Sequence, residues 1–157
     1  MAFTKKSWIP SHQRPNDLAL ILWRDGRCVT WDVTVSDTIA ASYLSLTCSY
    51  AGSAAEAAAT RKEEKYSEIT SNYLFFPLAF ETFGPINQTG CNFLSSLGHR
   101  LTLVSDDPRE FYFLFQRLSI SIQRFNHGMG PPAQGAPATK QLKLFSVLIN
   151  VNKCWPL

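Results

Sequence analysis

The feature that most restricts the fold of this chain is an Asp-Gly turn between two apolar runs. The runs LALILW (18–23) and CVTWDVTV (28–35) are separated by Arg-Asp-Gly-Arg, with Asp25 and Gly26 at its centre. Glycine accepts the positive φ angle that a tight turn between antiparallel strands requires, and apolar runs on both sides favour pairing. These residues therefore predict a β-hairpin around which the rest of the domain is built.

An aspartate, Asp32, lies in the middle of the second run. Alternate residues of a strand point to opposite faces, so Trp31 and Val33 share one face while Asp32 and Thr34 share the other. An ionised carboxylate is costly to bury unless a positive group pairs with it. Two interpretations stay open: the Asp32 face is exposed surface, or it faces a metal ion, a lysine or an arginine.

The middle of the chain predicts a helix followed by one more strand. Residues 53–68 combine alanine with charged residues, as good helix formers do, and Ser53 with Glu56 makes a capping-box pattern. YLFFPLAFE (73–81) is aromatic and strand-like, and Pro77 favours an edge position or a bulge.

Two amphipathic helices are expected after this strand. The first covers CNFLSSLGHRLTLV (91–104), and the second begins at Asp106-Asp107-Pro108 and continues to residue 125 with apolar residues at helical spacing. The order hairpin, helix, strand, helix, helix predicts an α/β (α+β) domain, with a small mixed sheet packed against helices. We expect residues 1–13 to form an irregular arm, residues 14–126 the domain, and residues 127–157 a Gly/Pro-rich linker and a divergent tail that holds one more strand candidate, LKLFSVLINV.

Composition excludes several classes of protein. The chain has 157 residues, 45% of them apolar and 13% aromatic, which predicts one ordered domain rather than a disordered chain. Four scattered cysteines without a CxxC pair predict reduced thiols in an intracellular protein. No run approaches the roughly 20 apolar residues that cross a bilayer, so no membrane partner is expected. The net charge of +3 is compatible with a polyanion partner without requiring one, and the oligomeric state stays open.

Three polar groups are candidates for a functional site. They are Asn16 with Asp17 before the first run, Asp32 with Thr34 in the second, and RKEEKY (61–66) in the predicted helix. Carboxylate oxygens hold hard divalent cations, and metal-dependent nucleases often add a lysine that orients the attacking water. Motifs of other enzyme classes, such as a phosphate-binding glycine loop, GxSxG or HExxH, do not occur.

The lysine of such a site would have to come from the predicted helix. Thr34 occupies the strand position where an acid-x-lysine pattern would place it. Lys62 and Tyr66 lie four residues apart on one helical face, and Lys65 lies three residues from Lys62. Each feature also has a plainer interpretation, because a lone strand aspartate is usually exposed or hydrogen-bonded and a charged helical run is usually a solvated face.

Taken together, these segments resemble a known family. The order RPNDLALILW, GRCVTWDVT, RKEEKY, FFPLAFETFG, FLSSLGHRL is similar to that of the restriction-endonuclease-like domains encoded downstream of reverse transcriptase in LINE-type retrotransposons. Those domains belong to the PD-(D/E)XK nuclease superfamily, and the resemblance runs from about Arg14 to Asn126. It implies a Mg²⁺-dependent endonuclease that nicks DNA, nuclear where it functions. Because the upstream part of the family's fold has no counterpart here, it also implies a truncated core.

The resemblance assigns roles to individual residues. The family's Arg-Pro-Asp-Gly corresponds to Arg14, Pro15, Asn16 and Asp17, so Asn16 takes the place of a metal-binding aspartate and Asp17 is one residue out of step. Asp32 matches the second acid. The loss of one carboxylate weakens the hold on a hard divalent ion, so we expect cleavage to be impaired in this copy.

The same resemblance covers the helix and the strand after it. Lys62, Lys65 and Tyr66 match a Lys-x-x-Lys-Tyr motif that supplies the lysine, and Thr34 matches a position at which such domains often lack one. The ETFG segment (81–84) matches a segment that we interpret as structural.

A non-enzymatic function stays open beside the nuclease hypothesis. The chain would then be a DNA-binding or protein-interaction module, or a remnant without a selected function. The first 27 residues hold five positive charges against two negative ones, from Lys5, Lys6, Arg14, Arg24 and Arg27. Such a cluster is suited to phosphate contacts, and it is equally typical of a solubilising terminus.

Overall fold

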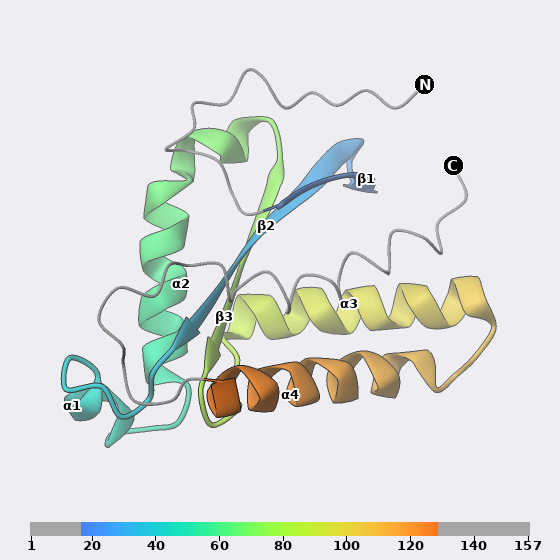
Figure 1. The fold of residues 1–157 in the computed structure, drawn as a ribbon. Helices are drawn as coiled ribbons and strands as arrows, with labels where there is room; N and C mark the ends of the chain where they lie inside the picture. The colour runs from blue at the N-terminus through green and yellow to red at the C-terminus, as the bar shows by residue number, and fades with distance from the viewer. Residues whose placement is uncertain (1–16, 129–157) are drawn as a thin grey trace.

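A mixed three-stranded sheet forms the centre of the fold (Figure 1). The computed structural model describes residues 17–128, with the backbone alone at residues 17–22 and 46. The strands are β1 (Asp17–Arg24), β2 (Arg27–Ser36) and β3 (Leu74–Glu81), in the order β1-β2-β3. β1 pairs with β2 in antiparallel fashion and β2 pairs with β3 in parallel. The predicted α+β class, with a hairpin and a small mixed sheet, is confirmed.

The Asp-Gly turn closes the hairpin as predicted. Asp25 and Gly26 have φ angles of 56° and 68°, and the flanking residues Arg24 and Arg27 face each other across the turn. Two successive positive φ angles characterise the tight turn whose twist matches that of paired antiparallel strands. Glycine is therefore required for its conformational freedom at position 26.

The proline in β3 is accommodated by the position of that strand. β3 lies at one edge of the described sheet, where β2 is its neighbouring strand and Pro77 lies opposite Asp32, and Phe80 on this strand forms an isolated bridge with Ile86. A proline has no backbone N–H to donate, which a strand tolerates where one of its sides has no neighbour. The predicted edge position of Pro77 is thus confirmed.

One helix, α2 (Ser53–Lys65), connects the two parallel strands and covers one face of the sheet. A short helix α1 (Leu44–Thr47) precedes it, and a 3-10 turn, η2 (Ser67–Ser71), follows it. The sheet-facing side of α2 is made of small residues: Ala55, Ala58 and Ala59 pack against Ala79 of β3. These small side chains let the helix approach the sheet closely.

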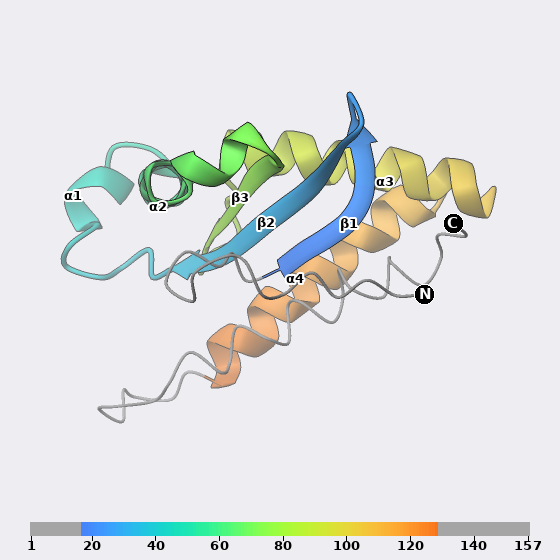
Figure 2. The ribbon, with the colours of Figure 1, turned by 90° about the horizontal axis from the view of Figure 1, so that it is seen from above.

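The opposite face of the sheet carries the main core, under two further helices. These are α3 (Gln88–Ser105) and α4 (Glu110–Gly128), and α3 contacts both β3 and α4. Figure 2, in which α2 is seen end-on, shows both long helices running in other directions than α2. The core side chains come from alternate positions of β2 and β3 and from one side of each helix: Val29, Trp31, Val33, Leu78, Phe80, Phe93, Leu94, Leu97, Leu101, Leu114, Leu118 and Ile122. Among the described residues, no helix has the length and apolar character needed to cross a membrane.

The expected capping box of α2 is wrong, because another residue caps the helix. The residue before α2 is Gly52, and no side chain of its own segment caps the first turn. Glu81, which is buried at the end of β3, accepts hydrogen bonds from the backbone N–H groups of Ala54 (2.9 Å) and Ala55 (3.3 Å) instead. Glu56 turns to the start of α3, where it accepts a hydrogen bond from the backbone of Gln88.

We expect Glu81→Ala to lower the free energy of unfolding by about 1–3 kcal/mol, because two buried N–H groups lose their acceptor. Glu81→Gln keeps an acceptor oxygen and should lose less. Urea denaturation followed by circular dichroism measures both changes. Glu63→Ala is a matched control, since Glu63 is an exposed residue of α2. A loss for Glu81→Ala no larger than that of the control would show that the cap contributes nothing.

Candidate functional site

The side of α2 that faces the sheet changes from apolar to polar along the helix. Its small apolar residues, Ala55, Ala58 and Ala59, lie toward the start of the helix. One and two turns further, at helical spacing, come Lys62 and then Tyr66, the residue that ends the helix. The RKEEKY segment is thus divided, with Lys62 and Tyr66 turned to the sheet and most of its other side chains exposed.

Lys62 meets Asp32 beneath the helix. Its Nζ lies 2.6 Å from Oδ2 of Asp32, as a hydrogen-bonded ion pair. The Asp32 side chain is 1% exposed and that of Lys62 is 25% exposed. The carboxylate is therefore taken out of water while the ammonium keeps part of its hydration. This answers the question that Asp32 raises in the sequence: its face of the strand is covered, and the positive group there is a lysine.

Tyr66 completes the cluster around the carboxylate. It is 2% exposed, and its ring lies 4.9 Å from that of Phe75 in β3. Burial raises the pKa of Tyr66 well above its ordinary value, and the charge of Asp32 and a hydrogen bond to it raise this pKa further. Tyr66 therefore stays neutral at physiological pH and stands beside the carboxylate as a protonated hydroxyl.

Two buried oxygen atoms near the ion pair have no hydrogen-bonding partner among the described residues. They are Oδ1 of Asp32 and Oγ1 of Thr34, two positions along the same face of β2. Buried polar atoms of this kind usually bind water or an ion. Oδ1 of Asp32 is thus the one carboxylate oxygen here that is available to a cation.

The described residues do not by themselves fit a Mg²⁺ ion. Within residues 17–128, no group of three or more histidine, cysteine, aspartate or glutamate side chains is placed to hold a metal. Asp32 supplies one carboxylate, and Lys62 already binds one of its two oxygens. Magnesium usually needs one or two carboxylates besides its waters and substrate oxygens, at near-ideal octahedral geometry. We therefore assign no chemical step to a bound metal.

Several predicted site residues lie elsewhere or cannot be placed. Lys65 is exposed and makes no ion pair with Asp32; its Nζ lies 4.9 Å from the centre of the Tyr66 ring. Strand register places Asp17 opposite Trp31, one position away from Asp32. Arg14 and Asn16 lie outside the described residues.

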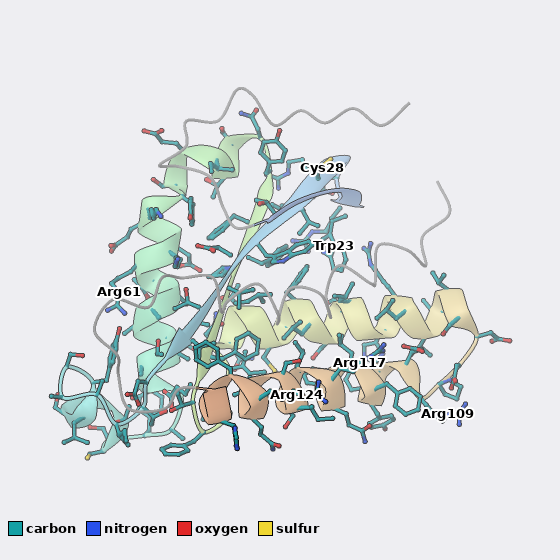
Figure 3. All side chains as sticks on the ribbon, in the orientation of Figure 1. Trp23, Cys28, Arg61, Arg109, Arg117 and Arg124 are labelled. Atoms are coloured by element: carbon teal, nitrogen blue, oxygen red, sulfur yellow. The ribbon has the colours of Figure 1, made fainter. Side chains whose placement is uncertain are left out.

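The predicted DNA contacts Arg24 and Arg27 lie together at the closed end of the hairpin. The side chain of Arg24 is 71% exposed and lies 3.9 Å from Asp25, and Arg27 is partly exposed. Nearby, Arg100 of α3 lies over the ring of Trp23, 3.9 Å from its centre, and donates a hydrogen bond to the carbonyl of Trp23. Figure 3 shows Trp23 at this end of the molecule. Sequence reasoning missed Arg100, because no local pattern links it to the hairpin.

A groove elsewhere on the molecule carries no acid–base chemistry. It has a volume of about 530 Å³ and lies between the segment after β3 and the part of α4 from Phe115 to Asn126, with Phe83 and Ile122 also in its lining. None of its lining residues is titratable, and none belongs to the Asp32 cluster. The Asp32–Lys62–Tyr66 cluster is therefore the better candidate for a catalytic function.

The raised pKa of Tyr66 predicts how stability depends on pH. An unfolded tyrosine loses its proton near pH 10, whereas Tyr66 holds it to higher pH, so the unfolded state binds fewer protons above about pH 10. The free energy of unfolding that Tyr66 contributes in this way is fully present below about pH 10. Above pH 10 it is lost at up to about 1.4 kcal/mol per pH unit. Denaturation between pH 9 and 11 should show a smaller fall for Tyr66→Phe than for the wild type. Tyr112→Phe, at an exposed position of α4, should keep the wild-type slope, and equal slopes for all three proteins would contradict the prediction.

Comparisons with known proteins identify no relative of this chain. No family model matches it, and neither a curated protein sequence nor a solved structure does. The interpretation of the cluster therefore depends on its own geometry and on the order of the sequence segments.

Proposed function

We propose that this chain is a retrotransposon-derived, restriction-endonuclease-like domain whose ancestral reaction is the metal-dependent nicking of DNA, and that this copy cleaves poorly. The observation that carries the proposal is the 2.6 Å contact between Nζ of Lys62 and Oδ2 of Asp32. The resemblance names Asp32 as the acid and Lys62 and Lys65 as the candidate lysines of one site, and Lys62 contacts Asp32 from 30 positions along the chain. A solvated helix face or an exposed strand aspartate would not have brought them together.

The order and direction of the strands are also those the proposal needs. The candidate acid lies on the second strand of an antiparallel hairpin, and the lysine lies on the helix that leads from this strand to its parallel neighbour. The lysine therefore approaches the acid from the helix, as is required when Thr34 occupies the strand position two residues after Asp32. In this arrangement the partly exposed Lys62 stabilises negative charge on a phosphate group, while the buried hydroxyl of Tyr66 lies beside Asp32.

Stability alone gives a weaker account of the cluster. Removing two charges from water costs several kcal/mol per ion, and buried ion pairs are often no more stabilising than apolar residues of similar volume. The alanines that cover the rest of this face show that an apolar contact between α2 and the sheet is available. A buried acid with a lysine partner and a tyrosine of raised pKa is instead typical of a functional site.

The expected weak cleavage of DNA follows from the number of carboxylates at the Asp32 site. The family motif calls for an aspartate where this chain has Asn16, and among the described residues no group of three or more histidine, cysteine, aspartate or glutamate side chains is placed to hold a metal. An amide oxygen is a neutral ligand, so the site has one negative charge fewer to hold a hard cation. Binding of DNA does not depend on this charge, so it can persist without efficient cleavage.

A gain-of-function substitution tests the site directly. Wild-type protein should nick supercoiled DNA slowly or not at all in Mg²⁺ or Mn²⁺, and Asn16→Asp should raise the rate by roughly tenfold or more, because it restores a carboxylate ligand. Adding Asp32→Ala or Lys62→Met to Asn16→Asp should return the rate to background. Lys65→Met, at an exposed position of the same helix, is the matched control and should leave the rate unchanged.

Two outcomes of this assay would contradict the proposal. Robust wild-type nicking that Asp32→Ala abolishes would show that the copy is not impaired. Nicking that persists in Asp32→Ala would remove Asp32 from the site altogether.

A DNA-binding module without cleavage is the second candidate, and the hairpin favours it. Arg24 and Arg27 are adjacent across the turn and are accessible to solvent, as side chains that contact phosphates must be. Arg100, over Trp23, adds a third guanidinium in the same region. The hairpin therefore presents a positive region of its own, within the part of the chain that the structure describes.

Salt dependence tests this second candidate. Binding to a short DNA duplex should weaken as salt rises, and Arg24→Gln with Arg27→Gln should reduce the log–log slope by about 0.9 for each phosphate that an arginine no longer neutralises. Fluorescence anisotropy at several salt concentrations measures the slope. Arg109→Gln is the control, because Arg109 is equally exposed but lies 2.9 Å from Asp107, whereas Arg24 lies 3.9 Å from Asp25. If the affinity for DNA does not change with salt concentration, the hairpin is excluded as a DNA contact. A log–log slope that changes equally in Arg109→Gln would exclude it as well.

A further inference from the structure

The groove between α4 and the segment after β3 has no cover within residues 17–128. It has a volume of about 530 Å³, and no charged side chain lines it. Several of its lining residues belong to the main core or pack against it, namely Ile86, Phe115, Leu118 and Ile122. Phe83 also lines the groove and is 72% exposed. Because covering a large aromatic side chain is favourable, the groove suits an apolar, uncharged occupant.

The chain leaves α4 at one end of this groove. The side-chain amide of Asn126, in the last turns of α4, donates a hydrogen bond to the carbonyl of Thr82 just after β3 (Figure 1). Both residues line the groove, and α4 ends two residues later, at Gly128. The residues that follow α4 therefore begin beside the groove.

The sequence after α4 supplies one segment of matching character. Residues 129–157 lie outside the described part of the chain, and within them LFSVLINVN (144–152) holds six large apolar residues and no charged one. Lys143 and Lys153 bound this apolar segment. Nearer to α4, GPPAQGAPAT (130–139) is rich in glycine, proline and alanine, which is typical of a linker. An uncharged apolar segment is thus tethered to an uncharged apolar groove.

The tether is long enough for the apolar segment to return along α4. The groove follows the helix from Phe115 to Asn126, which is about 16 Å at about 1.5 Å per residue. Residues 129–143 span up to about 50 Å when extended, and about five extended residues cover the length of the groove. Tethering also gives the segment an effective concentration on the order of millimolar at the groove. A contact with a dissociation constant well below this concentration is occupied most of the time.

We propose that the apolar segment 144–152 binds in the groove between α4 and the segment after β3 of its own chain, where it covers Phe83. The proposal is independent of the nuclease hypothesis, because none of the groove residues belongs to the Asp32 cluster. It assigns a binding function to an apolar surface of the domain and an intramolecular partner to it.

Hydrogen–deuterium exchange of the full chain, read by mass spectrometry, tests the proposal. Backbone amides of residues 144–152 should exchange roughly tenfold or more slowly than in an unprotected peptide, since a bound segment exchanges only when it leaves the groove. Phe83→Ser should remove this protection, because it removes the apolar side chain that the segment covers. Leu103→Ser is the matched control: Leu103 is 82% exposed on α3 and does not line the groove, so protection should persist.

A second variant tests the other wall of the groove. Ser119 is an exposed lining residue of α4, and Ser119→Arg places a charge where the apolar segment should bind, so protection of residues 144–152 should fall as in Phe83→Ser. Gln116→Arg adds the same charge at an exposed position of α4 that does not line the groove, and should leave the protection unchanged. Circular dichroism checks that the variants are folded, which the exposure of all four positions favours.

Three outcomes would overturn the proposal. Residues 144–152 that exchange in the wild type as fast as an unprotected peptide do not bind the groove. Protection that survives both Phe83→Ser and Ser119→Arg, or that the two controls also remove, places the segment elsewhere. Protection that rises with protein concentration, together with a dimer in size-exclusion chromatography, would mean that the segment binds a second copy rather than its own chain.

Discussion

The close approach of α2 to the sheet is the constraint on which the candidate site depends. Alanines at the sheet-facing positions of the helix pack against Ala79 of β3, and further along the same side of the helix Lys62 contacts the carboxylate of Asp32. Larger residues at these positions would raise the helix and leave a buried, unpaired aspartate, which is strongly destabilising. The alanine contacts and the ion pair therefore belong to one interface between α2 and the sheet. Small residues toward the start of α2 pack against Ala79, and Lys62 near its end pairs with Asp32.

The parts of the fold that local sequence determines could be predicted. The hairpin follows from Asp25 and Gly26, whose φ angles have the sign that the turn requires, and the edge position of β3 follows from Pro77. Helices α3 and α4 follow from apolar residues at helical spacing, although α3 begins earlier than its pattern indicates, at Gln88. Each of these features is decided within a few neighbouring residues.

Contacts between segments far apart in the sequence could not be predicted in the same way. The expected capping box failed because Glu81, from the end of a strand, caps α2 across the fold, which freed Glu56 to contact the start of α3. The choice between Lys62 and Lys65 likewise depends on how the helix is rotated against the sheet. One signal in the sequence indicates this rotation: Lys62 and Tyr66 continue the line of the buried alanines along the helix, whereas Lys65 lies to one side of it. The resemblance named both lysines, and packing distinguishes them.

A buried acid must be neutralised by something in every state in which the protein is folded. In a metal-dependent enzyme the metal can do this, but then the stability of the fold depends on the metal's concentration. In this protein Asp32 is neutralised by Lys62, which belongs to the same chain and pairs with Asp32 when α2 packs on the sheet. Asp32 and Lys62 therefore depend on each other, since removal of either would leave the other without its partner beneath the helix.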